Sequence, residues 1–234
     1  TDDGNVSATG PYQATKVETD KGLTLIKNED YWNGTPHLDT IYVKTITDGD
    51  TMTMSMQSGE LDAAYGLPYA SLSLFENDPY TISSVETSRS FYGTINYESE
   101  VLQDENVRRA IAGAIDKENF TRVLMNGNGS PAVGPFPASF TFGDSTVTAQ
   151  EYDPEASKKL LADAGWKDTD GDGYVEKDGE KLTIRWLTYP SRQELPLLAE
   201  SVQATLKEIG IDVQVNNTAN HLDFVDSGDW DIYA

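Results

Sequence analysis

The chain of 234 residues has no cysteine and very few histidines, only His37 and His221. The absence of cysteine excludes disulfides, thiolate catalysis and cysteine-ligated metals. No apolar run approaches the roughly 20 residues that cross a bilayer, so the sequence predicts no membrane-spanning helix. Neither histidine has a serine and an acid at recognisable spacing, which leaves a hydrolase triad without support.

Basic residues are also scarce, because 17 Lys and Arg stand against 39 Asp and Glu, for a formal net charge of −22. Polyanions would be repelled by this charge, so nucleic-acid binding is disfavoured. Two interpretations of the charge stay open, a solubilising surface and an acidic docking face. Otherwise 38% hydrophobic and 24% charged residues are ordinary for a soluble globular protein.

The first third of the sequence is dominated by strand patterns. Residues 12–18 and 23–28 predict a hairpin around Thr19-Asp20-Lys21-Gly22, and Thr40 to Thr45 predicts a further strand. Asp50 is expected to cap a helix from Thr51 to Ser58. Leu61 to Tyr65 is expected to be a short strand, and Val85 to Tyr97 a long extended stretch.

Helix signals follow. Val107, Ala110, Ile111, Ala114 and Ile115 form one apolar stripe of helical spacing, with Asp104 as cap. Asp116 is expected to cap a second helix that turns Phe120, Val123 and Leu124 inward. Asp153-Pro154-Glu155 starts a third helix.

The last third predicts a strand–helix–strand unit. The strands are Lys181 to Thr188 and Ile211 to Val215, the helix between them ends at Gly210, and the two strands should therefore be parallel. Trp230 to Tyr233 predicts one more strand. The fold class expected from these patterns is α/β.

Several short motifs, in order, resemble the family-5 extracytoplasmic solute-binding proteins of ABC importers, the peptide/nickel-binding type. They are Thr9-Gly10-Pro11-Tyr12, Lys27-Asn28-Glu29-Asp30-Tyr31-Trp32, Ser58-Gly59-Glu60-Leu61-Asp62-Ala63, Val107-Arg108-Arg109-Ala110-Ile111 with Ala114-Ile115-Asp116-Lys117, Gly134-Pro135-Phe136-Pro137, and Tyr152-Asp153-Pro154 with Ala164-Gly165-Trp166. Each motif alone is weak, but their shared order is specific.

The resemblance implies a two-lobed, periplasmic-binding-protein-like fold of the type II peptide/nickel cluster. Residues 1–92 would be part of lobe I with part of a crossing strand, and residues 93–234 would be lobe II, truncated at its C-terminal end. The chain is thus expected to be a central fragment of a longer protein. It would capture peptides outside the cytoplasmic membrane, as a periplasmic protein or a cell-surface lipoprotein, and deliver them to an ABC permease. It would not be an enzyme and would require no cofactor.

A nickel or metal-chelate carrier of the same family is the alternative ligand class. The predicted cleft contacts lie at strand ends, on the crossing strand and in the proline-rich loop: Tyr65, Arg89, Phe91, Tyr92, Asn96 and Phe136. Arginine can hold a carboxylate with two hydrogen bonds, and peptides and organic chelators both offer carboxylates. For each aromatic residue, packing in the core is an equally good interpretation. Solvent exposure is expected for His221, with a nickel-chelate contact as the lesser alternative.

An acidic loop has the spacing of a calcium site. Asp168, Asp170 and Asp172 take positions 1, 3 and 5, Tyr174 offers a backbone carbonyl and Glu176 a further carboxylate. Position 12 should be glutamate but is Gly179. The competing interpretation is an acidic turn stabilised by aspartate side-chain hydrogen bonds.

Two functions from other classes stay open. A calcium-stabilised surface adhesion module would lose thermal stability in chelator. A carboxylate-based hydrolase would show two carboxylate pKa values in its pH–rate profile, although no acidic pair is singled out by spacing.

Overall fold

The computed structural model describes residues 8–137, 140–142 and 147–234. The chain divides into two compact units, Thr1–Pro68 (unit 1) and Tyr69–Ala234 (unit 2). This division comes earlier in the chain than the lobe boundary expected between residues 92 and 93. The assignment of residues 1–92 and 93–234 to lobes I and II stays a prediction.

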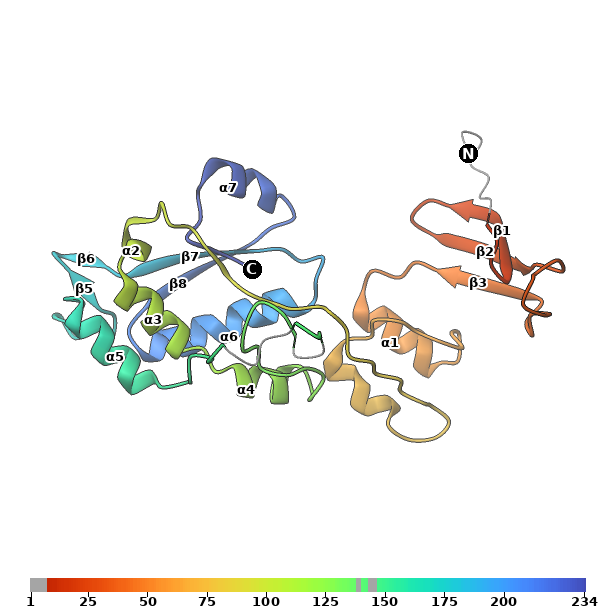
Figure 1. The fold of residues 1–234 in the computed structure, drawn as a ribbon, viewed down its shortest axis with the longest axis horizontal. Coiled ribbons are helices and arrows are strands. Elements are labelled where there is room, and N and C mark those ends of the chain that lie inside the picture. Colours follow the sequence, from red (N-terminus) through yellow and green to blue (C-terminus); the bar gives the residue numbers. More distant parts are fainter. Residues whose placement is uncertain (1–7, 138–139, 143–146) are drawn as a thin grey trace. The chain divides into compact units, whose positions relative to one another are not determined.

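Figure 1 shows the course of the chain and labels most of its helices and strands. Unit 1 contains β1 (Tyr12–Glu18), β2 (Gly22–Lys27), β3 (Thr40–Lys44) and α1 (Gly49–Gln57). Unit 2 contains a 3-10 helix (Tyr69–Phe75), β4 (Thr94–Ile95), α2 (Glu100–Gln103), α3 (Glu105–Gly113), α4 (Lys117–Asn119), a π-helical turn (Phe120–Leu124), α5 (Pro154–Asp163), β5 (Glu176–Lys177), β6 (Glu180–Lys181), β7 (Thr183–Thr188), α6 (Glu194–Glu208), β8 (Asp212–Asn217), α7 (His221–Ser227) and β9 (Ile232–Tyr233).

Unit 1 is built on an antiparallel sheet of order β1-β2-β3. The predicted hairpin and third strand are confirmed. Asp20 takes a positive φ of 61° in the hairpin turn, a conformation that aspartate tolerates better than most residues. Within residues 8–68 the buried side chains are the polar ones of Asn28 and Thr53. This part of unit 1 therefore buries no apolar core of its own.

Asn28 links two of the family-like motifs. Its side chain donates from Nδ2 to the carbonyl of Gly10 at 3.0 Å and accepts at Oδ1 from Gln13 Nε2, also at 3.0 Å. The backbone N–H of Asn28 donates to the carbonyl of Pro11 at 2.8 Å. Because a buried amide must satisfy its hydrogen bonds, Asn28 fixes the motif Thr9–Tyr12 beside the end of β2.

Two expectations for unit 1 are wrong. The cap of α1 is Asp48, whose carboxylate accepts from Thr51 N at 2.7 Å, while Asp50 lies in the first turn. Residues 61–65 do not form the predicted strand. A strand needs a neighbour for its N–H and C=O groups, and among the described residues no strand pairs with this segment.

Unit 2 is organised around a sheet of order β4-β9-β7-β8. β7 pairs in parallel with β8 and with β9, and β9 pairs antiparallel with β4. The predicted parallel strand–helix–strand unit is confirmed, and so is the strand near the C-terminal end. In the view of Figure 1, α6 lies on one side of β7 and β8, and α7 lies on the other.

The core of unit 2 forms where α3, α5 and α6 pack against this sheet. The apolar stripe of α3 is buried as predicted, and so are alternate residues on and just before β7. The large side chains that are fully buried are Leu102, Val107, Leu161, Leu182, Ile184, Leu187, Val202, Leu206 and Ile211. Each such side chain contributes about 1.5–3 kcal/mol relative to an exposed one, so this core outweighs the surface ion pairs.

Capping residues were predicted correctly in unit 2. Asp104, Asp116 and Asp153 accept hydrogen bonds from Asn106 N, Asn119 N and Ala156 N, respectively. Gly210 lies in the short connection between α6 and β8 and has a φ of 83°. A Cβ at this position would lie 2.9 Å from Val175 Cγ1. A side chain at position 210 would therefore be strained and crowded.

Two expectations for unit 2 are corrected. The exposed fraction of Val123 is 55%, so its side chain does not turn inward. Within residues 85–97 only Thr94–Ile95 pairs as a strand, β4. Sheet pairing in this stretch is limited to the point where β4 meets β9.

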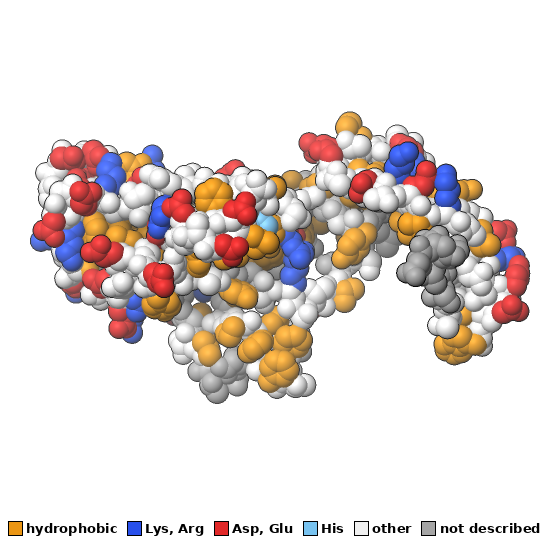
Figure 2. All heavy atoms as spheres, turned by 90° about the horizontal axis from the view of Figure 1, so that it is seen from above, with side chains coloured by type: hydrophobic (Ala, Val, Ile, Leu, Met, Phe, Trp, Pro, Cys, Tyr) orange, Lys and Arg blue, Asp and Glu red, His pale blue; other side chains and the backbone are white. Residues whose placement is uncertain are grey.

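The acidic side chains of the described residues are scattered over the face drawn in Figure 2, with lysine and arginine between them. This distribution favours the solubilising interpretation of the net charge of −22. None of the helices within the described residues is long and apolar enough to span a membrane.

Candidate functional site

Arg89 and Phe91 are the two predicted contacts that the structure brings together. The Arg89 guanidinium lies over the Phe91 ring, 4.8 Å from the ring centroid. Nη2 of Arg89 also donates to Oε2 of Glu194 at 2.9 Å. Phe91 packs against the core of unit 2, so the arginine rests on a fixed aromatic surface.

Asn96 has a structural role at β4. Its side-chain Nδ2 donates to the carbonyl of Trp230 at 2.9 Å, and its Oδ1 accepts from Glu98 N at 3.1 Å. Its backbone N–H donates to the carbonyl of Asp231 at 2.9 Å. These bonds hold β4 against β9 and use both the NH2 group and the oxygen of the side-chain amide. Asn96 thus has hydrogen-bond partners within the fold, and its contact with a ligand stays a prediction.

The other predicted contacts are exposed aromatic side chains. Tyr65 lies in unit 1 and is 98% exposed, while Tyr92 and Phe136 lie in unit 2 and are 67% and 51% exposed. The Phe136 ring meets that of Phe142 edge-on at 5.4 Å. Core packing is therefore wrong as an interpretation of these three aromatics, and their role in ligand contact stays a prediction.

An aromatic stack was missed by the sequence reasoning. The His221 ring stacks on Tyr189 at 4.3 Å and on Tyr233 at 5.8 Å between centroids. His221 Nδ1 is buried and has no hydrogen-bond partner among the described residues. Tyr189 follows the end of β7 and Tyr233 ends β9, and the carboxyl ends of parallel strands are where ligands bind in open α/β sheets. The place of both tyrosines at strand ends was the sequence signal that could have pointed to this stack.

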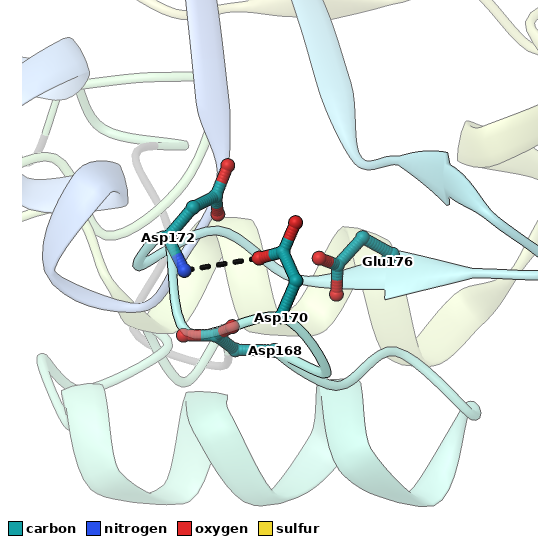
Figure 3. Close-up of side chains that lie close together, drawn as sticks. All are labelled: Asp168, Asp170, Asp172 and Glu176. Atoms are coloured by element: carbon teal, nitrogen blue, oxygen red, sulfur yellow. Dashed lines mark hydrogen bonds between the residues drawn. The ribbon is translucent and has the colours of Figure 1, made fainter.

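The acidic loop brings its carboxylates together, as Figure 3 shows. One oxygen from each of Asp168, Asp170, Asp172 and Glu176 lies within 4.8 Å of the others. Asp168 accepts from Gly171 N at 2.7 Å and from Gly173 N at 3.1 Å, and Asp170 accepts from Asp172 N at 3.0 Å. The side-chain hydrogen bonds expected of an acidic turn are thus present.

Lys181 occupies one side of this loop. Its ammonium donates to Asp172 Oδ2 at 2.7 Å and lies 4.2 Å from the centroid of the Tyr174 ring. The hydrogen bond from Lys181 holds the pKa of Asp172 below its ordinary value. The oxygen set suits a hard cation, whereas this lysine would compete with one for Asp172. Calcium binding stays a prediction.

Replacing Asp168 with alanine is expected to lower the midpoint of thermal unfolding by about 2–4 °C, because two backbone N–H groups lose their acceptor. Asp170→Ala is the matched control, since the Asp170 side chain accepts a single backbone hydrogen bond, from Asp172 N. Differential scanning calorimetry in EGTA measures both variants. Equal shifts would contradict the role given to Asp168.

Calorimetry of the same proteins in calcium tests the metal hypothesis. A calcium site predicts that calcium raises the unfolding midpoint of the unmodified protein and that Asp168→Ala abolishes the rise. No response to calcium would contradict the metal site and leave a turn held by its own hydrogen bonds.

These features together define a class of protein. Tyr189 and Tyr233 lie at the carboxyl ends of the parallel strands β7 and β9. In the same unit Arg89 is held by Glu194 and Phe91. Aromatic side chains at strand ends together with a few fixed polar groups are typical of ligand-binding α/β proteins. Comparison with known proteins agrees and is more specific. Residues 1–234 match the family described as bacterial extracellular solute-binding proteins, family 5, middle part, and the chain belongs to that family.

Relatives in this family bind different ligands. The chain is 32% identical over 209 residues to the oligopeptide-binding protein AppA of Bacillus subtilis, covering 88% of this chain and 38% of AppA. It is 26% identical over 212 residues to the nickel-binding periplasmic protein of Escherichia coli, covering 88% of this chain and 40% of that protein. The predicted family resemblance is confirmed.

A solved structure shows the same fold. The crystal structure of NikA from Brucella suis in complex with Fe(III)-EDTA matches with a TM-score of 0.88 and 25% identity, covering 97% of this chain and 47% of that one. The expected fold class, a two-lobed periplasmic binding protein of the peptide/nickel cluster, is therefore confirmed. The chain spans less than half the length of the relatives that it matches.

Proposed function

We propose that the protein is the substrate-binding component of an ABC importer and that it captures peptides outside the cytoplasmic membrane. The observation that carries this proposal is the family match over residues 1–234. The likeness to an oligopeptide-binding protein at 32% identity favours peptides as the ligand class. The protein then delivers its ligand to a membrane permease and breaks no bond.

Capture by such a protein depends on closure around the ligand. A ligand that makes more contacts in the closed form than in the open form stabilises the closed form by that difference. Arg89 and Phe91 supply one polar and one apolar surface for these contacts, and Tyr65, Tyr92 and Phe136 are proposed as further contacts. Family membership favours this role over a calcium-stabilised adhesion module, and the description of the family as extracellular supports a location outside the cytoplasm.

A metal chelate is the second candidate ligand. The likeness to NikA, whose crystal holds Fe(III)-EDTA, and to a nickel-binding periplasmic protein favours it. Chelates of this kind carry carboxylates, as peptides do, so Arg89 suits both ligand classes.

Isothermal titration calorimetry of the full-length protein separates the two ligand classes. One titration uses short synthetic peptides in chelator, and the other uses nickel with histidine. Peptide binding without metal supports the proposal. Binding of the nickel complex alone would show that the ligand is a metal chelate and not a peptide. Failure of both titrations would contradict a carrier of either kind.

A further inference from the structure

The ion pair between Arg89 and Glu194 joins two segments that lie 105 residues apart in the sequence. Nη2 of Arg89 and Oε2 of Glu194 are 2.9 Å apart, and their side chains differ sharply in exposure. The Glu194 side chain is 8% exposed, whereas that of Arg89 is 40% exposed. A ligand from solution can therefore reach the arginine but not the glutamate.

Arg89 is held from a second direction as well. Its guanidinium carbon lies 4.8 Å from the centroid of Phe91, a residue that packs against the core. A guanidinium fixed by an acid and an aromatic ring has lost most of its rotational freedom before any ligand binds. Less conformational entropy is then lost on binding, which favours a tighter and more selective complex.

The position of Glu194 explains why its carboxylate does not use up the positive charge and the donors of Arg89. Glu194 is the first residue of α6, a helix of 15 residues that follows the end of β7. The N-terminus of a helix stabilises a negative charge, so the carboxylate of Glu194 is offset by α6 as well as by Arg89. A guanidinium has five N–H donors, and Glu194 takes one of them.

From this arrangement we infer that Glu194 is a positioning residue, which holds Arg89 so that its remaining donors receive a carboxylate group of the bound ligand. The inference rests on the proposed function and narrows its ligand class to molecules with a carboxylate. Arg89 makes the contact, and Glu194 acts through Arg89. The exposure of the two side chains predicts a negatively charged ligand group, since the partner that the ligand can reach is the cation.

The test measures how strongly the protein prefers a free carboxylate over its amide. The probes are one mixed library of short synthetic peptides, prepared with free C-terminal carboxylates and again with C-terminal amides, both titrated into the full-length protein. The unmodified protein is expected to bind the free acids at least about tenfold more tightly. If the ligand is a nickel chelate instead, nickel with histidine and nickel with histidinamide are the corresponding pair.

Variants assign the preference to the two residues. Glu194→Gln is expected to reduce it several-fold, because a neutral amide holds the guanidinium less firmly. Arg89→Gln with Glu194→Gln is expected to abolish it, and this double variant leaves no buried carboxylate unpaired, so folding is retained. Glu105→Gln is the matched control. It removes the carboxylate from the exposed ion pair between Glu105 and Arg109 and should leave the preference unchanged.

The outcomes separate the inference from the proposed function. Tight binding of both libraries with no preference for the free acids would overturn the inference and leave the function standing. An unchanged preference in Glu194→Gln, with loss in the double variant, would overturn the positioning role of Glu194. No binding of peptides or of nickel complexes would overturn the function itself, and the inference with it.

Discussion

Replacing Arg185 with alanine is expected to destabilise the protein by about 3 kcal/mol, because it leaves the buried carboxylate of Asp231 without its cation. The Asp231 side chain is 5% exposed and accepts from Arg185 Nη2 at 2.7 Å and from Arg185 Nε at 3.1 Å. Arg185 lies on β7, and Asp231 immediately precedes β9. The pair therefore ties together β7 and β9, two neighbouring parallel strands of the sheet.

Urea unfolding followed by tryptophan fluorescence measures this loss. The control is Arg109→Ala, which breaks a pair with Glu105 in which both side chains are 63% exposed. Exposed pairs of this kind contribute little, so the control should change the free energy of unfolding by under about 0.5 kcal/mol. Similar losses in the two variants would show that burial of Asp231 is not what matters.

The same pair predicts a dependence on pH. Burial raises the pKa of Asp231, but hydrogen bonds from Arg185 and Ser99 lower it by more. The pKa of Asp231 therefore lies below its ordinary value. The stability that this carboxylate contributes is therefore present above the ordinary aspartate pKa of about 3.9 and is lost as the pH falls through the lowered pKa. The gap in unfolding free energy between the unmodified protein and Arg185→Ala should shrink as the pH falls through that range.

Replacing Leu206 with alanine is expected to cost about 3 kcal/mol, since the side chain is fully buried between α6 and the sheet and its removal leaves a cavity. Leu197→Ala is the matched control on the same helix, because that side chain is 38% exposed. The control should lose less than about 1 kcal/mol. Equal losses by urea unfolding would contradict the packing of α6 against the strands.

Sequence predicts those elements of this fold whose signals are local. The stripe on α3 and the caps Asp104 and Asp153 depend on residues a few positions apart, and the structure has them as expected. Asp48 and Asp50 stand two residues apart, and either could begin α1. Choosing between them needs the backbone conformation, which the side-chain pattern does not contain.

Partners distant in sequence were beyond prediction. The pattern at residues 61–65 suited a strand, but pairing is decided by a neighbour, and no strand pairs with these residues in the described parts of the chain. Its residue type and its place on the expected crossing strand predict that Arg89 contacts a carboxylate, and this contact stays a prediction. Its link to Glu194 spans 105 residues and depends on how the chain folds back at α6. Tyr189 follows a strand that was predicted to be parallel, and Tyr233 ends a further predicted strand, so their places at strand ends were a signal for the aromatic stack.

Native mass spectrometry of the full-length protein, purified gently from its expression host, tests the central claim most directly. A carrier of peptides predicts a series of bound masses that correspond to peptides, and a carrier of chelates predicts a single small adduct or nickel with an organic chelator. A spectrum of empty protein, unchanged after addition of peptides and of nickel with histidine, would contradict the assignment as a substrate-binding component.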